Sequence, residues 1–228
     1  MLSKNELLDV VHQQKIKLND DNSYPRKLLK DLTHLDREFV HIISGIRRCG
    51  KSTLMAQLIR LQAEPSLYLN FDTPRLFGFE FSDFRVIDEI LREQSEVKWL
   101  FFDELQIVES WEIFVRGKLD EGYGVVITGS NASLLSRELG TKLTGRHINK
   151  ELFPFSFQEF CGYKHLEKGK ESLKNYLNTG GFPQYIKTKN KEILNQLVMD
   201  IVYRDIAVRY NIRDEQSLKR LFIFLVSN

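Results

Sequence analysis

Between Phe39 and Leu152 the chain alternates short apolar runs with amphipathic stretches. The first four runs are almost continuously apolar, which is typical of strands buried on both faces of a parallel sheet. We therefore predict strands at Phe39–Ser44, Ser66–Phe71, Val97–Phe102, Gly124–Thr128 and His147–Leu152. The intervening stretches carry apolar residues at helical spacing and predict helices at Ser52–Gln62, Ser82–Gln94, Trp111–Asp120 and Ala132–Leu143. This alternation indicates βαβ units in a three-layer α/β domain.

The pattern becomes purely helical after Phe155. It predicts helices at Ser156–Tyr163, Glu171–Asn178 and Lys191–Arg209, with Gly180-Gly181-Phe182-Pro183 as a break. We divide the chain into a core with an N-terminal helical segment (residues 1–155), a helical subdomain (156–190) and the helical start of a further domain (191–228). The last residues are apolar without an evident cap, so we expect either a fragment of a longer protein or a terminal helix that docks on something.

Composition narrows the class of protein but not its function. The 228 residues carry a formal net charge of +2 and an ordinary apolar fraction, which argues against disorder and is neutral about nucleic acid. The two cysteines, Cys49 and Cys161, predict no disulfide framework and a reducing compartment. No apolar run approaches the ~20 residues of a membrane helix, and the polar N-terminus does not resemble a signal peptide. We expect a soluble, cytoplasmic protein.

The segment from Gly45 to Ser52 matches G-x-x-x-x-G-K-[ST] in full, and an apolar strand leads directly into it. Its glycines let successive backbone N–H groups face one anion at a helix N-terminus. Lys51 is then expected to bridge the β- and γ-phosphates, and the Ser52 hydroxyl to ligate Mg²⁺. The residues expected to hold the nucleotide here are Gly45, Ile46, Arg47, Arg48, Cys49, Gly50, Lys51, Ser52 and Thr53. Either Arg47 or Arg48 contacts phosphate or a carboxylate behind the loop, or both are solvated.

Two carboxylates follow the third apolar run. Asp103 is expected to contact Mg²⁺, and Glu104 to act as the catalytic base that polarises the attacking water. Asp72, after the second run, is a rival for the metal, although a turn or cap role is more common there. A guanine-reading Asn-Lys-x-Asp string is absent, since the nearest strings, at Asn149 and Asn190, lack the Asp. The sequence therefore favours ATP.

The fourth run ends in small polar residues. Ser130 or Asn131 is a candidate to contact the γ-phosphate, as is Thr128 just before them, and the alternative is that Ser130 or Asn131 caps the following helix. Arg146, immediately before the fifth strand, is a candidate catalytic arginine that reaches the γ-phosphate of a neighbouring subunit. The alternative is a structural arginine paired with a surface carboxylate. Arg137 is a weaker candidate.

Eight segments, in this order, resemble the prokaryotic AAA+-like ATPases that carry a G-x-R-R-x-G-K-[ST] loop. They are Gly45–Ser52, Tyr68–Asp72, Phe102–Gln106, Trp111-Glu112, Thr128–Asn131, Leu143–Arg146, Phe153–Phe157 and Gly180–Pro183. The resemblance implies an ASCE-type P-loop NTPase core with strand order 5-1-4-3-2, a helical lid and a longer C-terminal region. It also implies that ATP hydrolysis drives or gates some other event.

Two hypotheses about function follow. In the first, the chain is a Mg²⁺-dependent ATPase that uses Lys51, Ser52, Asp103 and Glu104 to couple its nucleotide state to a conformational change or a partner. In the second, it is a slow or inactive ATP-dependent switch, and family analogy adds an association with DNA. We expect ATP as ligand, a second copy of the chain or an unidentified protein or DNA as partner, and no membrane.

Overall fold

The computed structural model describes residues 2–19, 23–130, 143, 145–207, 210 and 212–227. These residues divide into two compact units. The first takes in the described parts of 1–44, 51–129 and 134–152, and the second takes in those of 45–50, 130–133 and 153–228. None of the described helices is long and apolar enough to cross a lipid bilayer.

The first unit is built on a five-stranded, all-parallel sheet of order β2-β3-β4-β1-β5. This is the predicted order 5-1-4-3-2 viewed from the other edge, so the P-loop NTPase fold class is confirmed. The strands are β1 (Val40–Gly45), β2 (Ser66–Asn70), β3 (Trp99–Asp103), β4 (Gly124–Ser130) and β5 (His147–Glu151). Each lies within two residues of its predicted bounds.

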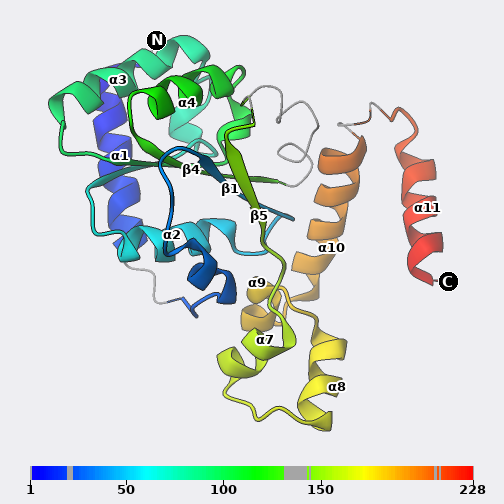
Figure 1. Ribbon diagram of the computed structural model, residues 1–228. Coiled ribbons are helices and arrows are strands. Elements are labelled where there is room, and N and C mark those ends of the chain that lie inside the picture. Colours follow the sequence, from blue (N-terminus) through cyan, green and yellow to red (C-terminus); the bar gives the residue numbers. More distant parts are fainter. Residues whose placement is uncertain are drawn as a thin grey trace. The chain divides into compact units, whose positions relative to one another are not determined.

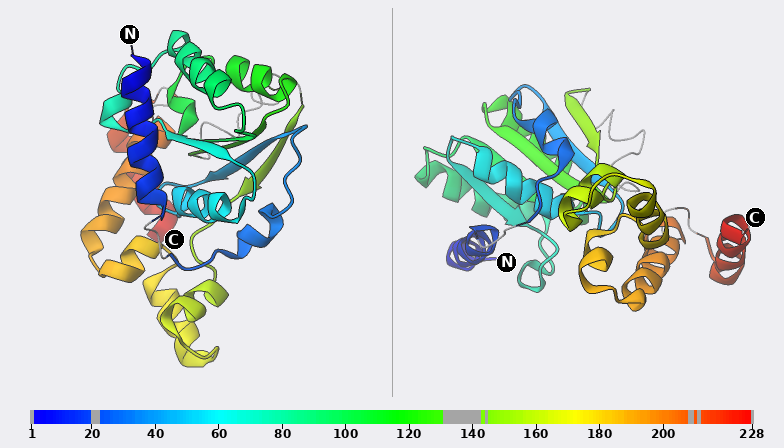
Figure 2. Two further views of the ribbon diagram at one scale, coloured as in Figure 1. Left: turned by 90° about the vertical axis from the view of Figure 1, so that its left-hand side faces the viewer. Right: turned by 90° about the horizontal axis from the view of Figure 1, so that it is seen from below.

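Helices cover both faces of this sheet (Figure 1). α3 (Phe84–Glu93) and α4 (Trp111–Asp120) lie on one face, and α2 (Lys51–Leu61) lies on the other. α1 (Lys4–Asn19) runs beside the edge strand β2, as Figure 2 shows. The short 3₁₀ helices are η1 (Lys27–Leu32), η2 (Pro74–Leu76), η3 (Phe81–Asp83) and η4 (Leu105–Ile107). The predicted helix Ala132–Leu143 lies outside the described residues, apart from Leu143.

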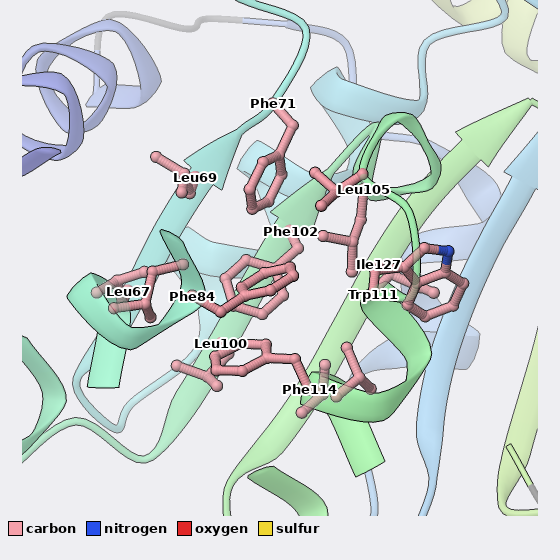
Figure 3. Close-up of a cluster of buried hydrophobic side chains, with 14 of the residues drawn as sticks. Leu67, Leu69, Phe71, Phe84, Leu100, Phe102, Leu105, Trp111, Phe114 and Ile127 are labelled. Atoms are coloured by element: carbon pink, nitrogen blue, oxygen red, sulfur yellow. The ribbon is translucent and has the colours of Figure 1, made fainter. Parts of the chain in front are cut away.

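The main hydrophobic core fills the space between the sheet and the α3–α4 layer (Figure 3). Alternate residues of β2 and β3 enter it, namely Leu67, Leu69, Leu100 and Phe102. Phe84 of α3 stacks on Phe114 of α4, with ring centroids 4.1 Å apart. Because side chains alternate along a strand, the residues between these apolar ones face α2 instead. That parity places Tyr68, Asn70 and Asp103 on one face.

The second unit is helical. It contains α7 (Phe157–Lys164), α8 (Lys170–Thr179), α9 (Pro183–Thr188), α10 (Lys191–Met199) and α11 (Glu215–Ser227). The predicted helix Lys191–Arg209 is found as α10 followed directly by a π-helix, η5 (Asp200–Ala207), and its last two residues lie outside the described part of the chain.

Two segments that carry the family resemblance meet inside this unit. The Phe155 N–H donates to the Gly181 carbonyl at 2.7 Å, and the Tyr176 hydroxyl donates to the Phe155 carbonyl at 2.8 Å. A Cβ added at Gly181 would lie 2.3 Å from the Phe155 carbonyl oxygen. The Phe153–Phe157 and Gly180–Pro183 segments are therefore a packing junction in which a glycine is required by close backbone approach.

We predict that Gly181→Ala destabilises the protein by about 1–3 kcal/mol, because its methyl group would collide with backbone that cannot move aside. Gly117→Ala in α4 is the matched control, since nothing lies within 4 Å of its added Cβ. The control should gain about 0.5–1 kcal/mol from helix propensity. Urea unfolding followed by circular dichroism measures both. Equal stability of Gly181→Ala and the parent would contradict the junction.

Candidate functional site

Three polar side chains stand side by side on neighbouring strands. Asn70 pairs with Asp103 in the β2–β3 register, and both lie on the α2 face. The β3–β4 register pairs Phe102 with Ile127, so the next residues in line are Asp103 and Thr128. Asp103 thus has a polar neighbour on each side at the carboxyl ends of the strands, where open α/β sheets bind their ligands.

The Asp103 carboxylate has no exposed surface and is held by three donors. The Thr128 hydroxyl donates to Oδ1, while the Tyr68 hydroxyl at 3.2 Å and the Asn70 amide at 3.3 Å donate to Oδ2. Burial and the neighbouring carboxylate raise the pKa of Tyr68 above its usual range, which keeps the phenol a neutral donor. The carboxylate is thereby held in one orientation although it lies in the interior.

Glu104 leaves the sheet through a sharp backbone turn. Its φ of 54° and ψ of 35° are left-handed, a conformation that few non-glycine residues adopt and that often marks a functional site. Its N–H donates to Thr128 Oγ1 at 3.1 Å, so Thr128 joins both carboxylate residues. The Glu104 Oε2 accepts from Gln106 Nε2, and Oε1 lies 3.6 Å from the Lys51 ammonium. The turn therefore places the Glu104 carboxylate beside the ammonium group of Lys51.

Lys51, Ser52 and Thr53 form the first turn of α2. A helix N-terminus concentrates unpaired N–H groups and favours anions. Lys51 is almost completely buried, with 5% of its surface exposed, whereas Ser52 is exposed. One end of α2 thus combines a fixed ammonium group, an accessible hydroxyl and a helix terminus, which together suit a phosphate chain.

The loop before α2, residues 45–50, belongs to the second unit. Arg48 and Gly50 adopt positive φ values of 61° and 102°, and the Cys49 N–H donates to the Ile46 carbonyl at 3.3 Å. The Arg48 guanidinium lies 4.0 Å from the Asp200 carboxylate at the start of the π-helix. One of the two loop arginines therefore faces a carboxylate, and its contact with a nucleotide stays a prediction.

A pocket of about 440 Å³ opens between α1, α2 and the end of β2. We call it the α1–β2 pocket, and its lining includes Gln14, Lys17, Ser52, Thr53, Tyr68 and Asn70. Ser52 thus shares a pocket with two of the side chains that orient Asp103. A hydroxyl and a carboxylate are the hard oxygen donors that Mg²⁺ prefers. No cluster of three or more His, Cys, Asp or Glu gathers in the described part of the chain.

The remaining predicted residues lie elsewhere. Arg146 lies at the amino-terminal end of β5, where its guanidinium is 2.5 Å from Asp120 and its carbonyl accepts from Val40 N–H. Lys51 follows the carboxyl end of β1, so Arg146 lies at the opposite ends of the strands and, within its own chain, is remote from the phosphate site. Its action on a neighbouring subunit stays a prediction. The Asn131 and Arg137 candidates and the Ser130 side chain lie outside the described residues.

Sequence reasoning missed Tyr68 and Gln106 and left the role of Thr128 open. Strand parity places the first and the last on the Asp103 face of adjacent strands, but without the register it does not single either of them out. Asp72, the rival metal ligand, is an exposed turn residue whose N–H donates to Asn70 Oδ1 at 2.8 Å. Asp72 also lines the α1–β2 pocket, so its role as a metal ligand stays a prediction.

Comparisons with known proteins bear on this arrangement. An uncharacterized protein of Methanocaldococcus jannaschii is 35% identical over 204 residues, which are 82% of this chain and 46% of that protein. An uncharacterized protein of Haemophilus influenzae is 34% identical over 212 residues, 85% of this chain and 52% of that protein. The chain thus spans about half the length of the curated relatives it matches.

A solved structure and a family model complete the comparison. The Walker-type ATPase of Pyrococcus abyssi aligns with a TM-score of 0.50 and 15% identity over 81% of this chain and 76% of that one, a likeness of fold alone. The model of the AAA domain family matches residues 37–161. That match exceeds half of the chain and contains the loop, the carboxylate pair and all five strands. The chain therefore belongs to the AAA domain family of P-loop ATPases.

Proposed function

We propose that this chain binds ATP together with Mg²⁺ and hydrolyses it to ADP and phosphate. The observation that carries the proposal is the Lys51–Glu104 pair, in which the ammonium and carboxylate that phosphoryl transfer needs lie 3.6 Å apart. The oriented Asp103 lies next to it in the chain. ATP is favoured over GTP because the sequence lacks a guanine-reading Asn-Lys-x-Asp string.

Each side chain of the site has a separate role in the proposed reaction. Lys51 contacts the β- and γ-phosphate oxygens and offsets their negative charge as the bond to the leaving ADP breaks. Glu104 accepts a hydrogen bond from the attacking water and takes its proton as the new bond to phosphorus forms. Ser52 and Asp103 would hold Mg²⁺, which would supply positive charge to offset that of the phosphate chain. Thr128 orients both carboxylate residues from the neighbouring strand.

A coupling between nucleotide state and the helical part of the chain is a further element of the proposal. Its support is the contact of Arg48, inside the phosphate loop, with Asp200 at the start of the π-helix. A loop that changes conformation with its nucleotide would alter this contact. We propose that a partner, a second copy of the chain or another protein or DNA, responds to that change in the cytoplasm.

We expect Glu104→Gln to bind ATP like the parent but to turn over about 10²- to 10⁴-fold more slowly, because it lacks the proton acceptor. Lys51→Ala should lose ATP binding. A fluorescent ATP analogue reports binding, and phosphate release reports turnover. Glu109→Gln is the control, since Glu109 is an exposed carboxylate further along the same segment. If all variants bind ATP alike and none hydrolyses it, these catalytic assignments are wrong.

The slow-switch alternative has its own supporting observation. Both Glu104 oxygens already have neighbours, Gln106 on one and Lys51 on the other. A base engaged in this way would turn over slowly until a partner released it. The ATPase and the slow switch assign different roles to the Gln106 amide. In the ATPase it orients Glu104 for catalysis, and in the switch it restrains Glu104 from acting.

We predict that Gln106 orients the base, so Gln106→Ala should lower kcat about tenfold or more, the effect of one hydrogen bond to a charged group. ATP binding should stay unchanged, and single-turnover phosphate release at saturating ATP makes the measurement. A rise in kcat in Gln106→Ala would reverse the conclusion and support the switch.

Arg146 generates a prediction about assembly. If it completes the site of a neighbouring subunit, turnover per subunit rises with protein concentration, and Arg146→Ala loses about 10³-fold or more at high concentration. Asp120→Ala breaks the same ion pair but keeps the arginine, so it should remain active. Equal loss in both variants would indicate that the pair is structural.

A further inference from the structure

The amide of Gln14 in α1 takes the place of a neighbouring strand at the end of β2. The Asn70 N–H donates to Gln14 Oε1 at 2.7 Å, and Gln14 Nε2 donates to the Asn70 carbonyl at 3.0 Å. Both backbone groups of Asn70 are thereby satisfied on the open side of an edge strand. A side chain 56 residues away in sequence therefore fixes the backbone of Asn70.

Asn70 transmits this constraint to Asp103. Its side-chain oxygen accepts from the Asp72 N–H at 2.8 Å, so its NH₂ group is the end that faces Asp103 Oδ2, at 3.3 Å. Tyr68 donates to the same oxygen from two residues earlier on β2. The end of β2 thus acts as one rigid support for one oxygen of the buried carboxylate.

The same residues share a pocket with Ser52, the other expected metal ligand. Gln14, Tyr68 and Asn70 line the α1–β2 pocket together with Ser52. Residues that hydrogen-bond to metal ligands tune metal affinity by fixing ligand orientation. We propose that Gln14 is a positioning residue for the Mg²⁺ site. Gln14 acts through Asn70 on the orientation of Asp103, so α1 takes part in metal binding. This inference rests on the proposed function.

α1 has attachments that do not involve Gln14, which lets the role be tested. Leu7 and Val10 are buried in the main core, and Asp9 forms an ion pair of 2.8 Å with Arg75. Loss of the Gln14 amide should therefore leave α1 in place. Gln14→Met keeps the length and helix propensity of the side chain while it removes both hydrogen bonds.

The experiment is a Mg²⁺ titration of nucleotide binding, followed with a fluorescent ATP analogue on the intact chain. We expect Gln14→Met to raise the Mg²⁺ concentration at half-maximal binding about threefold to tenfold, the effect of one net hydrogen bond. Nucleotide binding in EDTA should not change. Gln13→Ala is the control, because Gln13 is exposed and its amide donates to Asp9 of the same helix, at 3.4 Å. In an Asn70→Ala background Gln14→Met should add nothing, since coupled residues are not additive.

Three outcomes would overturn the inference. If Gln14→Met and Gln13→Ala both match the parent while the parent binds nucleotide in a Mg²⁺-dependent way, the proposed function stands and Gln14 has no part in it. If Gln14→Met weakens binding equally in EDTA and in Mg²⁺, its role is structural. If the parent shows no Mg²⁺-dependent binding, the proposed function and the inference fail together.

Discussion

The buried carboxylate of Asp103 is the group on which the rest of this site depends. A carboxyl group without exposed surface is tolerated only where donors replace the water it has lost. Those donors come from both flanking strands. Tyr68 and Asn70 donate from β2 on one side, and Thr128 donates from β4 on the other. A one-residue slip of β2 would bring Leu69 or Phe71 to the carboxylate instead. The strand register is therefore specified by the hydrogen bonds to this carboxyl group as well as by the apolar faces.

The adjacent carboxylates take different roles because the backbone separates them. Asp103 points to the α2 face as the last residue of β3, and Glu104 adopts a left-handed conformation directly afterwards. Thr128 contacts both, accepting from one backbone N–H and donating to one carboxylate. One carboxyl group is enclosed among neutral donors, and the other is 20% exposed beside an ammonium group. Two acids with such different surroundings can divide metal binding and proton transfer between them.

Local signals account for what could be predicted from the sequence. Continuous apolar runs gave strand positions because strands of a parallel sheet are buried on both faces, and the loop motif placed Lys51 and Ser52 at a helix start. Tyr68 could not be singled out, because within an apolar run its hydroxyl looks like part of the core. The choice among Thr128, Ser130 and Asn131 stayed open since it depends on register against β3. Gln14 was inaccessible to such reasoning, because its contact joins residues 56 positions apart.

α1 lies outside residues 37–161, the segment that matches the AAA domain family, yet it covers the exposed edge of that domain's sheet. β2 is an edge strand, and an edge presents unpaired backbone groups that invite other chains. A helix cannot continue the strand ladder, but a single amide side chain supplies one donor and one acceptor with the spacing of a peptide group. Gln14 places that amide at Asn70, the residue whose side chain holds Asp103. The edge is thus closed at the position where movement of the strand would disturb the buried carboxylate most.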